Sequence, residues 1–381
     1  MTADRGGLPT SLVGWFPGDP EPPPPRSPSD GGPRPFDTRL PAEIFAAPPP
    51  RPTEVISLSA TSEVTVHPAT GAATMVSPVR PEPRPPAEPA LPAIGSVIEK
   101  YRIEALLGTG GFAAVYRATH LLLRIPVALK LLKPKVLKQR PLLADLLCEE
   151  ARFAAQLNHP NVVRVFDVTH NQKITYIVME YIEGESLYQT IHRRGRVRPS
   201  DALRLGIDVT NGLKAALEQG LIHRDIKPAN ILLARNGIAK IVDLGLAQHS
   251  DDLAKGKDTA REVVGTPMYM APEQALRPED VDFRADIYSL GATLYHAVTG
   301  QPPFPDQDAV KVLHMHQRDP VRPPEEIVPG IPFDLSRVLL WMLQKDRSAR
   351  PDYDQLLAGL DEALKATAIE GNTGGLEGLV E

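Results

Sequence analysis

The spacing of apolar and polar residues divides the chain into two parts at about residue 95. The first part has few large apolar residues. From Tyr101 onward, alternating or continuous apolar runs of strand length predict β-strands. The predicted strand runs are YRIEALL (101–107), AAVYRAT (113–119), PVALKLL (126–132), VVRVFDV (162–168) and ITYIVMEYI (174–182).

The apolar spacing becomes helical after Ser200. DALRLGIDVTNGLKAALEQ is followed by Gly220, and ADIYSLGATLYHAVT is followed by Gly300. Glycine often ends a helix because it readily adopts a left-handed backbone. We therefore predict an α+β fold, with a small β-rich lobe, a larger helical lobe and a cleft between them where a ligand can bind.

Composition separates the first part from the packed domain. The chain has 41 prolines, and more than half precede Pro92, in runs such as EPPPPRSP and RPEPRPPAEP. Few apolar residues are available there to offset chain entropy. We predict a disordered proline-rich tail over 1–95, whose polyproline runs could bind a partner. The predicted domain covers 101–364, and 365–381 form a short C-terminal tail.

Net charge, cysteine content and targeting signals limit the possible partners and the cellular location of the protein. The formal net charge of −5 is spread over mixed signs and gives no reason to expect nucleic acid as a partner. Cys148 is the single cysteine, which excludes an internal disulfide and suits a reducing compartment. The chain start lacks a signal-peptide pattern, and no run of about 18 apolar residues occurs. We predict a cytoplasmic location and no membrane span.

The most informative stretch is LIHRDIKPANILLARNGIAKIVDLGLA, residues 221–247. Asn-Gly between two strand-like runs predicts a hairpin because both residues tolerate positive φ. Closing the hairpin brings Asn230 near Asp243, with Asp225 on the incoming loop. Such oxygen ligands suit Mg²⁺ bridging to substrate phosphates. Asp225 is then available to accept a proton from a hydroxyl.

The octapeptide HRDIKPAN, with DLG thirteen residues after its asparagine, resembles the catalytic and metal-binding loops of the protein kinase superfamily. This resemblance implies the two-lobed kinase fold. It further implies that Lys130 holds the α- and β-phosphates of ATP. Glu150 is similar to the helix glutamate that pairs with this lysine, since it falls on an apolar stripe where a carboxylate needs a partner. Glu149 also has apolar neighbours at helical spacing and remains an alternative.

Further motifs follow in the family's order. The segment from Asp243 to Glu273 resembles an activation segment ending in APE, and it contains Thr266 in GTPMY. By resemblance, Asp286 braces the catalytic loop and Arg350 pairs with Glu273. The resemblance covers about 260 residues. Lys227, the short loops and the MAPEQ sequence are most similar to the bacterial eukaryotic-like serine/threonine kinases.

The resemblance also implies a nucleotide site. Gly108, Gly110 and Gly111 would close over the phosphates, while Ala113 replaces the third loop glycine and Leu244 the phenylalanine of DFG. Both replacements are small enough to leave the site working. The remaining expected nucleotide contacts are the gatekeeper Met179, the backbone of Glu180 and Ile182, and the apolar side chains of Val115, Ala128 and Leu232.

The predicted reaction is transfer of the γ-phosphoryl group of Mg-ATP to protein serine or threonine. Asn230 and Asp243 would bind Mg²⁺, and Asp225 would orient the hydroxyl while Lys227 offsets phosphate charge. We also expect autophosphorylation at Thr259, through transient self-association, with Arg224 holding the phosphate. The alternatives are a pseudokinase that binds partners without turnover, a small-molecule kinase of related fold, and a proline-rich scaffold.

Overall fold

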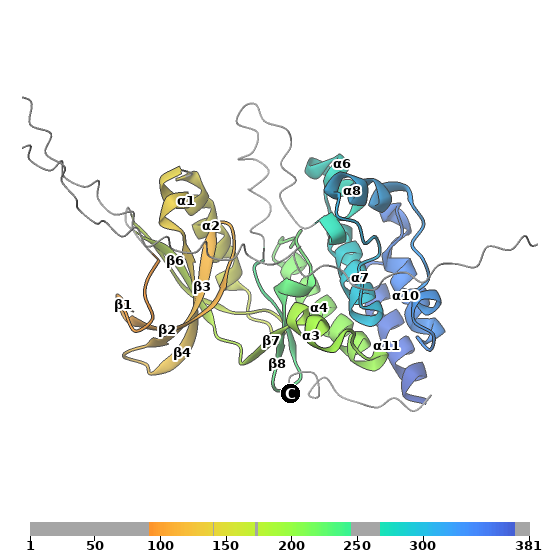
Figure 1. Cartoon of the computed structure of the whole chain (residues 1–381), viewed down its shortest axis with the longest axis horizontal. Helices are drawn as coiled ribbons and strands as arrows, with labels where there is room; N and C mark the ends of the chain where they lie inside the picture. The colour runs from red at the N-terminus through yellow and green to blue at the C-terminus, as the bar shows by residue number, and fades with distance from the viewer. Residues whose placement is uncertain (1–90, 140, 172–173, 245–266, 370–381) are drawn as a thin grey trace, which may run out of the picture. The chain divides into compact units, whose positions relative to one another are not determined.

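The computed structural model describes residues 91–139, 141–171, 174–244 and 267–369, except for the side chains at positions 143, 146, 150, 368 and 369. A β-rich lobe comes first and a helical lobe follows (Figure 1). The predicted α+β class and lobe order are therefore confirmed. Of the predicted tail over 1–95, residues 1–90 lie outside the described residues. Within its last five residues the Gly95 N–H donates to the Ile103 carbonyl over 2.8 Å, so bonded backbone begins slightly before Tyr101.

The first lobe is built on one antiparallel sheet with strand order β1-β2-β3-β4-β6-β5. Its strands are β1 (Val97–Ile98), β2 (Tyr101–Thr109), β3 (Ala113–His120), β4 (Ile125–Leu132), β5 (Val165–His170) and β6 (Thr175–Glu180). All five predicted runs contain a strand. The run 162–168 enters the sheet only at Val165, because Val162 forms a bridge with Ile241 of the second lobe instead.

Two helices follow β4. They are α1 (Pro134–Gln139) and α2 (Leu142–Gln156). The helix expected to carry Glu150 is α2. Leu147 and Ala151 pack against Ile177 of β6, so the apolar stripe of α2 covers one face of the sheet.

A small second sheet carries the informative hairpin. It has the order β7-β8-β9, with β7 (Gly184–Ser186), β8 (Ile231–Ala234) and β9 (Ala239–Ile241). The hairpin is confirmed, but its turn is longer than two residues, since Ala234 N–H donates to Ile238 O over 3.0 Å. Gly237 alone has a positive φ, of 79°, and Asn236 instead accepts the Ile238 N–H through Oδ1.

The second lobe is helical. Its α-helices are α3 (Leu187–Arg194), α4 (Pro199–Glu218), α6 (Pro272–Leu276), α7 (Arg284–Thr299), α8 (Ala309–Arg318), α9 (Pro324–Ile327), α10 (Phe333–Met342) and α11 (Tyr353–Ile369). The two predicted helices are α4 and α7, and Gly300 ends α7 in a left-handed conformation. Residues of α4, α7, α10 and α11 form the main core. Across the described ranges, no helix combines the length and apolarity that a membrane crossing requires.

Candidate active site

A buried carboxylate fixes the loop that carries Asp225. Asp286 of α7 accepts the N–H of His223 over 2.8 Å and that of Arg224 over 2.7 Å. Burial raises the pKa of Asp286, whereas His223 and the two backbone N–H groups oppose the rise. The His223 ring is also buried, and its Nε2 lies 2.9 Å from the Val242 carbonyl. The predicted bracing role of Asp286 agrees with these contacts, and the His223 ring joins the loop to the backbone just before Asp243.

Asp225 lies at the centre of a polar cluster. Lys227 Nζ is 2.8 Å from Asp225 Oδ2, and the Asn230 amide donates to the same oxygen over 3.0 Å. Asn230 also donates to the Asp225 carbonyl over 2.9 Å. The Asp225 side chain remains 31% exposed, so it can accept a further hydrogen bond from solvent or a ligand.

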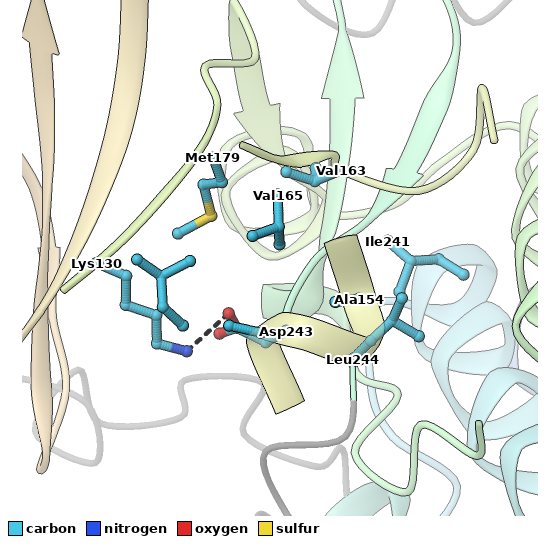
Figure 2. A pocket seen from close by; sticks show the side chains of 10 residues that line it. Lys130, Ala154, Val163, Val165, Met179, Ile241, Asp243 and Leu244 are labelled. Atoms are coloured by element: carbon cyan, nitrogen blue, oxygen red, sulfur yellow. Dashed lines mark ion pairs between the residues drawn. The ribbon is translucent and has the colours of Figure 1, made fainter. Parts of the chain in front are cut away.

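The hairpin brings Asn230 and Asp243 to one end, as its sequence predicts. The Val242 N–H donates to the Asn230 carbonyl over 3.0 Å, which ties the residue before Asp243 to the catalytic loop. Asp243 Oδ1 forms a 2.7 Å ion pair with Lys130 Nζ from β4 (Figure 2). The sequence placed both residues at the phosphates but did not predict this direct pair.

A small cavity of about 40 Å³ lies beside this ion pair. Figure 2 shows Lys130, Met179, Asp243 and Leu244 around it. The lining residues are Lys130, Ala151, Ala154, Val163, Val165, Ile177, Met179, Ile241, Asp243 and Leu244. Leu244 is buried and packs with Leu157 and Val162. Leu244, at the position of the DFG phenylalanine, therefore packs beside the end of α2.

An apolar slot lies between the two sheets. Ala128, Val163 and Met179 are buried together, and four partly buried residues pack against them: Val115, Ile182, Leu232 and Val242. All the apolar side chains predicted for the nucleotide site thus come together. Val163 and Val242 were not predicted. Val242 directly precedes Asp243, and that proximity was the available signal, whereas Val163 has no predicted site residue next to it in the sequence.

The backbone beyond β6 has an unused donor. Within the described part of the chain, the Ile182 N–H has no hydrogen-bond acceptor. Glu180 is held in place, because its side chain pairs with Lys240 Nζ at 3.0 Å and its N–H donates to the Arg164 carbonyl over 2.8 Å.

The glycine-rich turn joins β2 to β3. A Cβ at Gly108 or Gly111 would meet no atom within 4 Å, and one at Gly110 would reach only the Ala113 carbonyl at 3.9 Å. None of the three glycines has a positive φ. Neither packing nor backbone conformation therefore requires glycine here. Close approach of a ligand is the remaining physical reason for three such residues.

Some predicted residues cannot be placed. The side chain of Glu150 and all of Thr259 and Thr266 lie outside what the structure describes. The alternative, Glu149, is exposed on α2, which disfavours it as the partner of Lys130. The assignment of Glu150 stays a prediction.

The predicted pair of Glu273 and Arg350 is confirmed. Arg350 Nη1 and Nη2 lie 2.6 and 2.8 Å from the two Glu273 carboxylate oxygens. The Arg350 side chain is fully buried, and a bidentate pair is the favourable geometry for such a charge. This contact fixes α6, at the end of the predicted activation segment, to the helical lobe.

Comparison with known proteins agrees with this geometry. The family model described as "Protein kinase domain" matches residues 101–359. The chain is 36% identical over 260 residues to the "Probable serine/threonine-protein kinase PknB" of Bifidobacterium longum, covering 66% of this chain and 37% of that protein. It is 37% identical over 256 residues to the "Serine/threonine-protein kinase PknB" of Mycolicibacterium smegmatis, covering 66% and 41%. The protein of that name from Mycobacterium tuberculosis is 36% identical over 256 residues, again covering 66% and 41%.

The chain therefore belongs to the protein kinase family, among the bacterial eukaryotic-like serine/threonine kinases. The family predicted from HRDIKPAN and DLG is confirmed. The chain spans about two fifths of the length of these curated relatives.

Proposed function

We propose that this chain transfers the γ-phosphoryl group of Mg-ATP to serine and threonine hydroxyls of proteins. The observation that carries the proposal is the convergence of Lys130, Asp225 and Asp243. Lys130 comes from the first lobe and pairs with Asp243, while Val242 ties Asp243 to the loop that holds Asp225. An intact set of this kind is what phosphoryl transfer requires, because its catalysis depends chiefly on positioning and charge.

The nucleotide would bind across the apolar slot. The adenine ring fits between Val115 and Ala128 on one side and Leu232 on the other, beside the gatekeeper Met179. The Ile182 N–H and the Glu180 carbonyl would bond its polar edge. Gly108, Gly110 and Gly111 would let the backbone approach the phosphates, which Lys130 would hold.

The donor set suits Mg²⁺. In the described ranges, no group of three or more His, Cys, Asp or Glu residues forms a metal site. Asn230 and Asp243 would supply two hard oxygen ligands, and Mg²⁺ commonly takes its remaining ligands from phosphates and water. The Asn230 amide donors are used by Asp225, which leaves its Oδ1 for the metal. When bound, the metal neutralises charge on the phosphates.

Asp225 would act on the substrate hydroxyl. In the transfer, a bond forms between the hydroxyl oxygen and the γ-phosphorus, and the bond to the β-phosphate oxygen breaks. The hydroxyl proton goes to the Asp225 carboxylate. Lys227, 2.8 Å from Asp225, would offset the charge of the transferred group. Glu150 would hold Lys130 in the active state.

Control by phosphorylation is a finer part of the proposal. Arg224 Nε is buried and has no hydrogen-bond partner in the described structure. A guanidinium in this state suits a phosphate oxygen. We expect Thr259 to carry that phosphate after autophosphorylation through transient self-association. A partner for the proline-rich tail and a cytoplasmic location stay predictions from the sequence.

The pseudokinase alternative would keep the fold without turnover. It is disfavoured because Lys130, Asp225 and Asp243 are all present, with Lys130 paired to Asp243 and Asp225 paired to Lys227. A small-molecule kinase is disfavoured by the GTPMYMAPEQ segment, which resembles a protein-substrate docking floor.

The test is incubation of the full chain with γ-labelled ATP, Mg²⁺ and a generic protein substrate, followed by phosphosite mapping. We expect phosphoserine and phosphothreonine, and none with Lys130→Met. Phosphate should appear at Thr259, and Thr259→Ala should lower the rate on other substrates. Absence of transfer by the unmodified chain would overturn the proposed function. Full activity with no phosphate between Asp243 and Glu273 would overturn only the regulatory part.

A further inference from the structure

Asp243 has an unusual backbone. Its φ is 62°, in the left-handed region that few residues other than glycine adopt. Such a conformation is strained and persists only where surrounding contacts hold it. The strand before it, β9, has only three residues and pairs with β8 on one edge. Its other contacts must therefore supply much of the required rigidity.

The chain between α2 and β5 forms hydrogen bonds with the edge of β9 that does not pair with β8. The Ile241 N–H donates to the Asn161 carbonyl over 2.9 Å, and the Val163 N–H donates to the Ile241 carbonyl over 2.9 Å. Val162 and Ile241 form a parallel bridge. A first-lobe segment thus completes the sheet of the second lobe, two residues before Asp243.

Two side chains hold the start of β9. The Asn161 amide donates to the Ala239 carbonyl over 3.0 Å, and the Ala239 N–H donates to Asp208 Oδ2 over 2.8 Å. Asn161 is 6% exposed, and it also bonds Asp208. Burial raises the pKa of Asp208, and the donors from Ala239 and Asn161 oppose that rise. Both backbone groups of Ala239 are therefore fixed, one from each lobe.

Close packing supports the same junction. Gly212 of α4 faces Asn161 and Ile241, and an added Cβ would come within 2.9 Å of the Asn161 carbonyl oxygen. Beyond Asp243, Leu244 packs against Leu157 and Val162. The segment 157–163 therefore contacts the chain on both sides of Asp243.

We propose that Asn161 is a positioning residue for Asp243, which fixes β9 between the lobes so that the carboxylate meets the metal and Lys130. The role of Asn161 in metal binding rests on the proposed function, but the contacts between Asn161 and β9 are present whether or not the chain is active.

The test uses Asn161→Ala in the full chain, with Thr210→Val as a matched control. Thr210 is also buried, and the hydrogen bond that the variant loses runs from its hydroxyl to the Gly206 carbonyl within α4, not to β9. Calorimetry measures ADP affinity with and without Mg²⁺, and hydrogen exchange follows residues 239–243. We expect Asn161→Ala to weaken Mg-ADP binding about tenfold, to change metal-free ADP binding less than twofold, and to speed exchange over 239–243. Thr210→Val should leave all three near wild type.

A second pair of variants approaches the junction from α4. Asp208→Asn keeps an acceptor for the Ala239 N–H and should retain Mg-ADP affinity, whereas Asp208→Ala should lose it as Asn161→Ala does. Equal weakening of Mg-ADP and metal-free ADP binding, or faster exchange with unchanged Mg-ADP affinity, would overturn the proposal. A wild-type chain that binds Mg-ADP but transfers no phosphate would contradict the proposed function and leave this result standing.

Discussion

Ala113 occupies the position where the family pattern has its third loop glycine. Its backbone is not in the left-handed region, and it pairs with Leu132 as an ordinary strand residue of β3. A methyl group is compatible with this conformation. The departure from the pattern is therefore no defect in backbone geometry.

We predict that Ala113→Gly changes ATP affinity and turnover by less than about tenfold, or ~1.4 kcal/mol. The physical reason is that the strand conformation at position 113 is open to alanine, so the extra conformational freedom of glycine brings no advantage. Steady-state kinetics at varied ATP concentration measure the effect. A hundredfold gain would mean that the natural loop is impaired.

At the scale of elements, α4 approaches β9 closely because Gly212 has no side chain at the contact. A Cβ at Gly212 would lie 2.9 Å from both the Asn161 backbone oxygen and Ile241 Cδ1. Gly359 in α11 is also helical, but its added Cβ would make only ordinary contacts, at 3.6 Å. Replacing each glycine by alanine therefore distinguishes the effect of overpacking, expected only at Gly212, from the gain in helix propensity, expected at both.

We predict that Gly212→Ala destabilises the fold by about 1–3 kcal/mol through overpacking. Gly359→Ala should stabilise it by about 0.5–1 kcal/mol, because alanine favours the helix. Urea unfolding of the two variants and the wild type measures both changes. Stabilisation by Gly212→Ala would show that α4 can move away from β9 at little cost.

Elements with a strong period could be predicted from the sequence. The strands β2 to β6 and the helices α2, α4 and α7 follow from apolar spacing, and Gly300 marks a helix end correctly. The short elements β1, β7 and α1 were missed because two to six residues carry too little periodic signal. The Asn-Gly hairpin was predicted correctly, and within its turn only Gly237 has a left-handed backbone, while Asn236 forms a local side-chain bond.

At the scale of the whole molecule, the half-buried His296 and the buried His316 link stability to pH. Burial lowers the pKa of His296 to about 4, and it lowers that of His316 to about 3 with help from the nearby Lys345 charge. His296 Nδ1 is 2.7 Å from the Tyr269 hydroxyl, and His316 Nδ1 is 2.8 Å from that of Tyr288. Both rings are neutral in the folded protein, whereas an unfolded histidine binds a proton near pH 6.5.

The stability from these rings is complete above about pH 6.5 and is lost as the pH falls toward 4 for His296 and 3 for His316. Each can contribute up to ~1.4 kcal/mol per pH unit in this window. Urea unfolding at pH 7 and pH 5 measures the loss. His296→Gln should have a smaller difference between the two pH values than the wild type. An equal difference would show that His296 is not buried in its neutral form.

The residues of the candidate site differ in whether a short stretch of sequence is enough to identify them. HRDIKPAN and the Asn-Gly hairpin identify Asp225, Asn230 and Asp243, because a few neighbouring residues determine their placement. The apolar slot was predicted by resemblance except for Val163 and Val242. The contact of Asn161 with Ala239 joins residues 78 apart in sequence, and no local pattern reports it. The Lys130–Asp243 ion pair is long-range in the same way.

The central claim is that the converged residues perform phosphoryl transfer, with Asp225 accepting the hydroxyl proton. Asp225→Asn keeps the size of the side chain and an oxygen acceptor but removes the base. The most direct measurement follows phosphate transfer to a protein serine or threonine by wild type and Asp225→Asn, with Mg-ADP affinity and unfolding measured on the same samples. We predict that phosphate transfer by Asp225→Asn falls at least a hundredfold while nucleotide affinity and stability stay near wild type. Transfer by Asp225→Asn at a rate near wild type would contradict it.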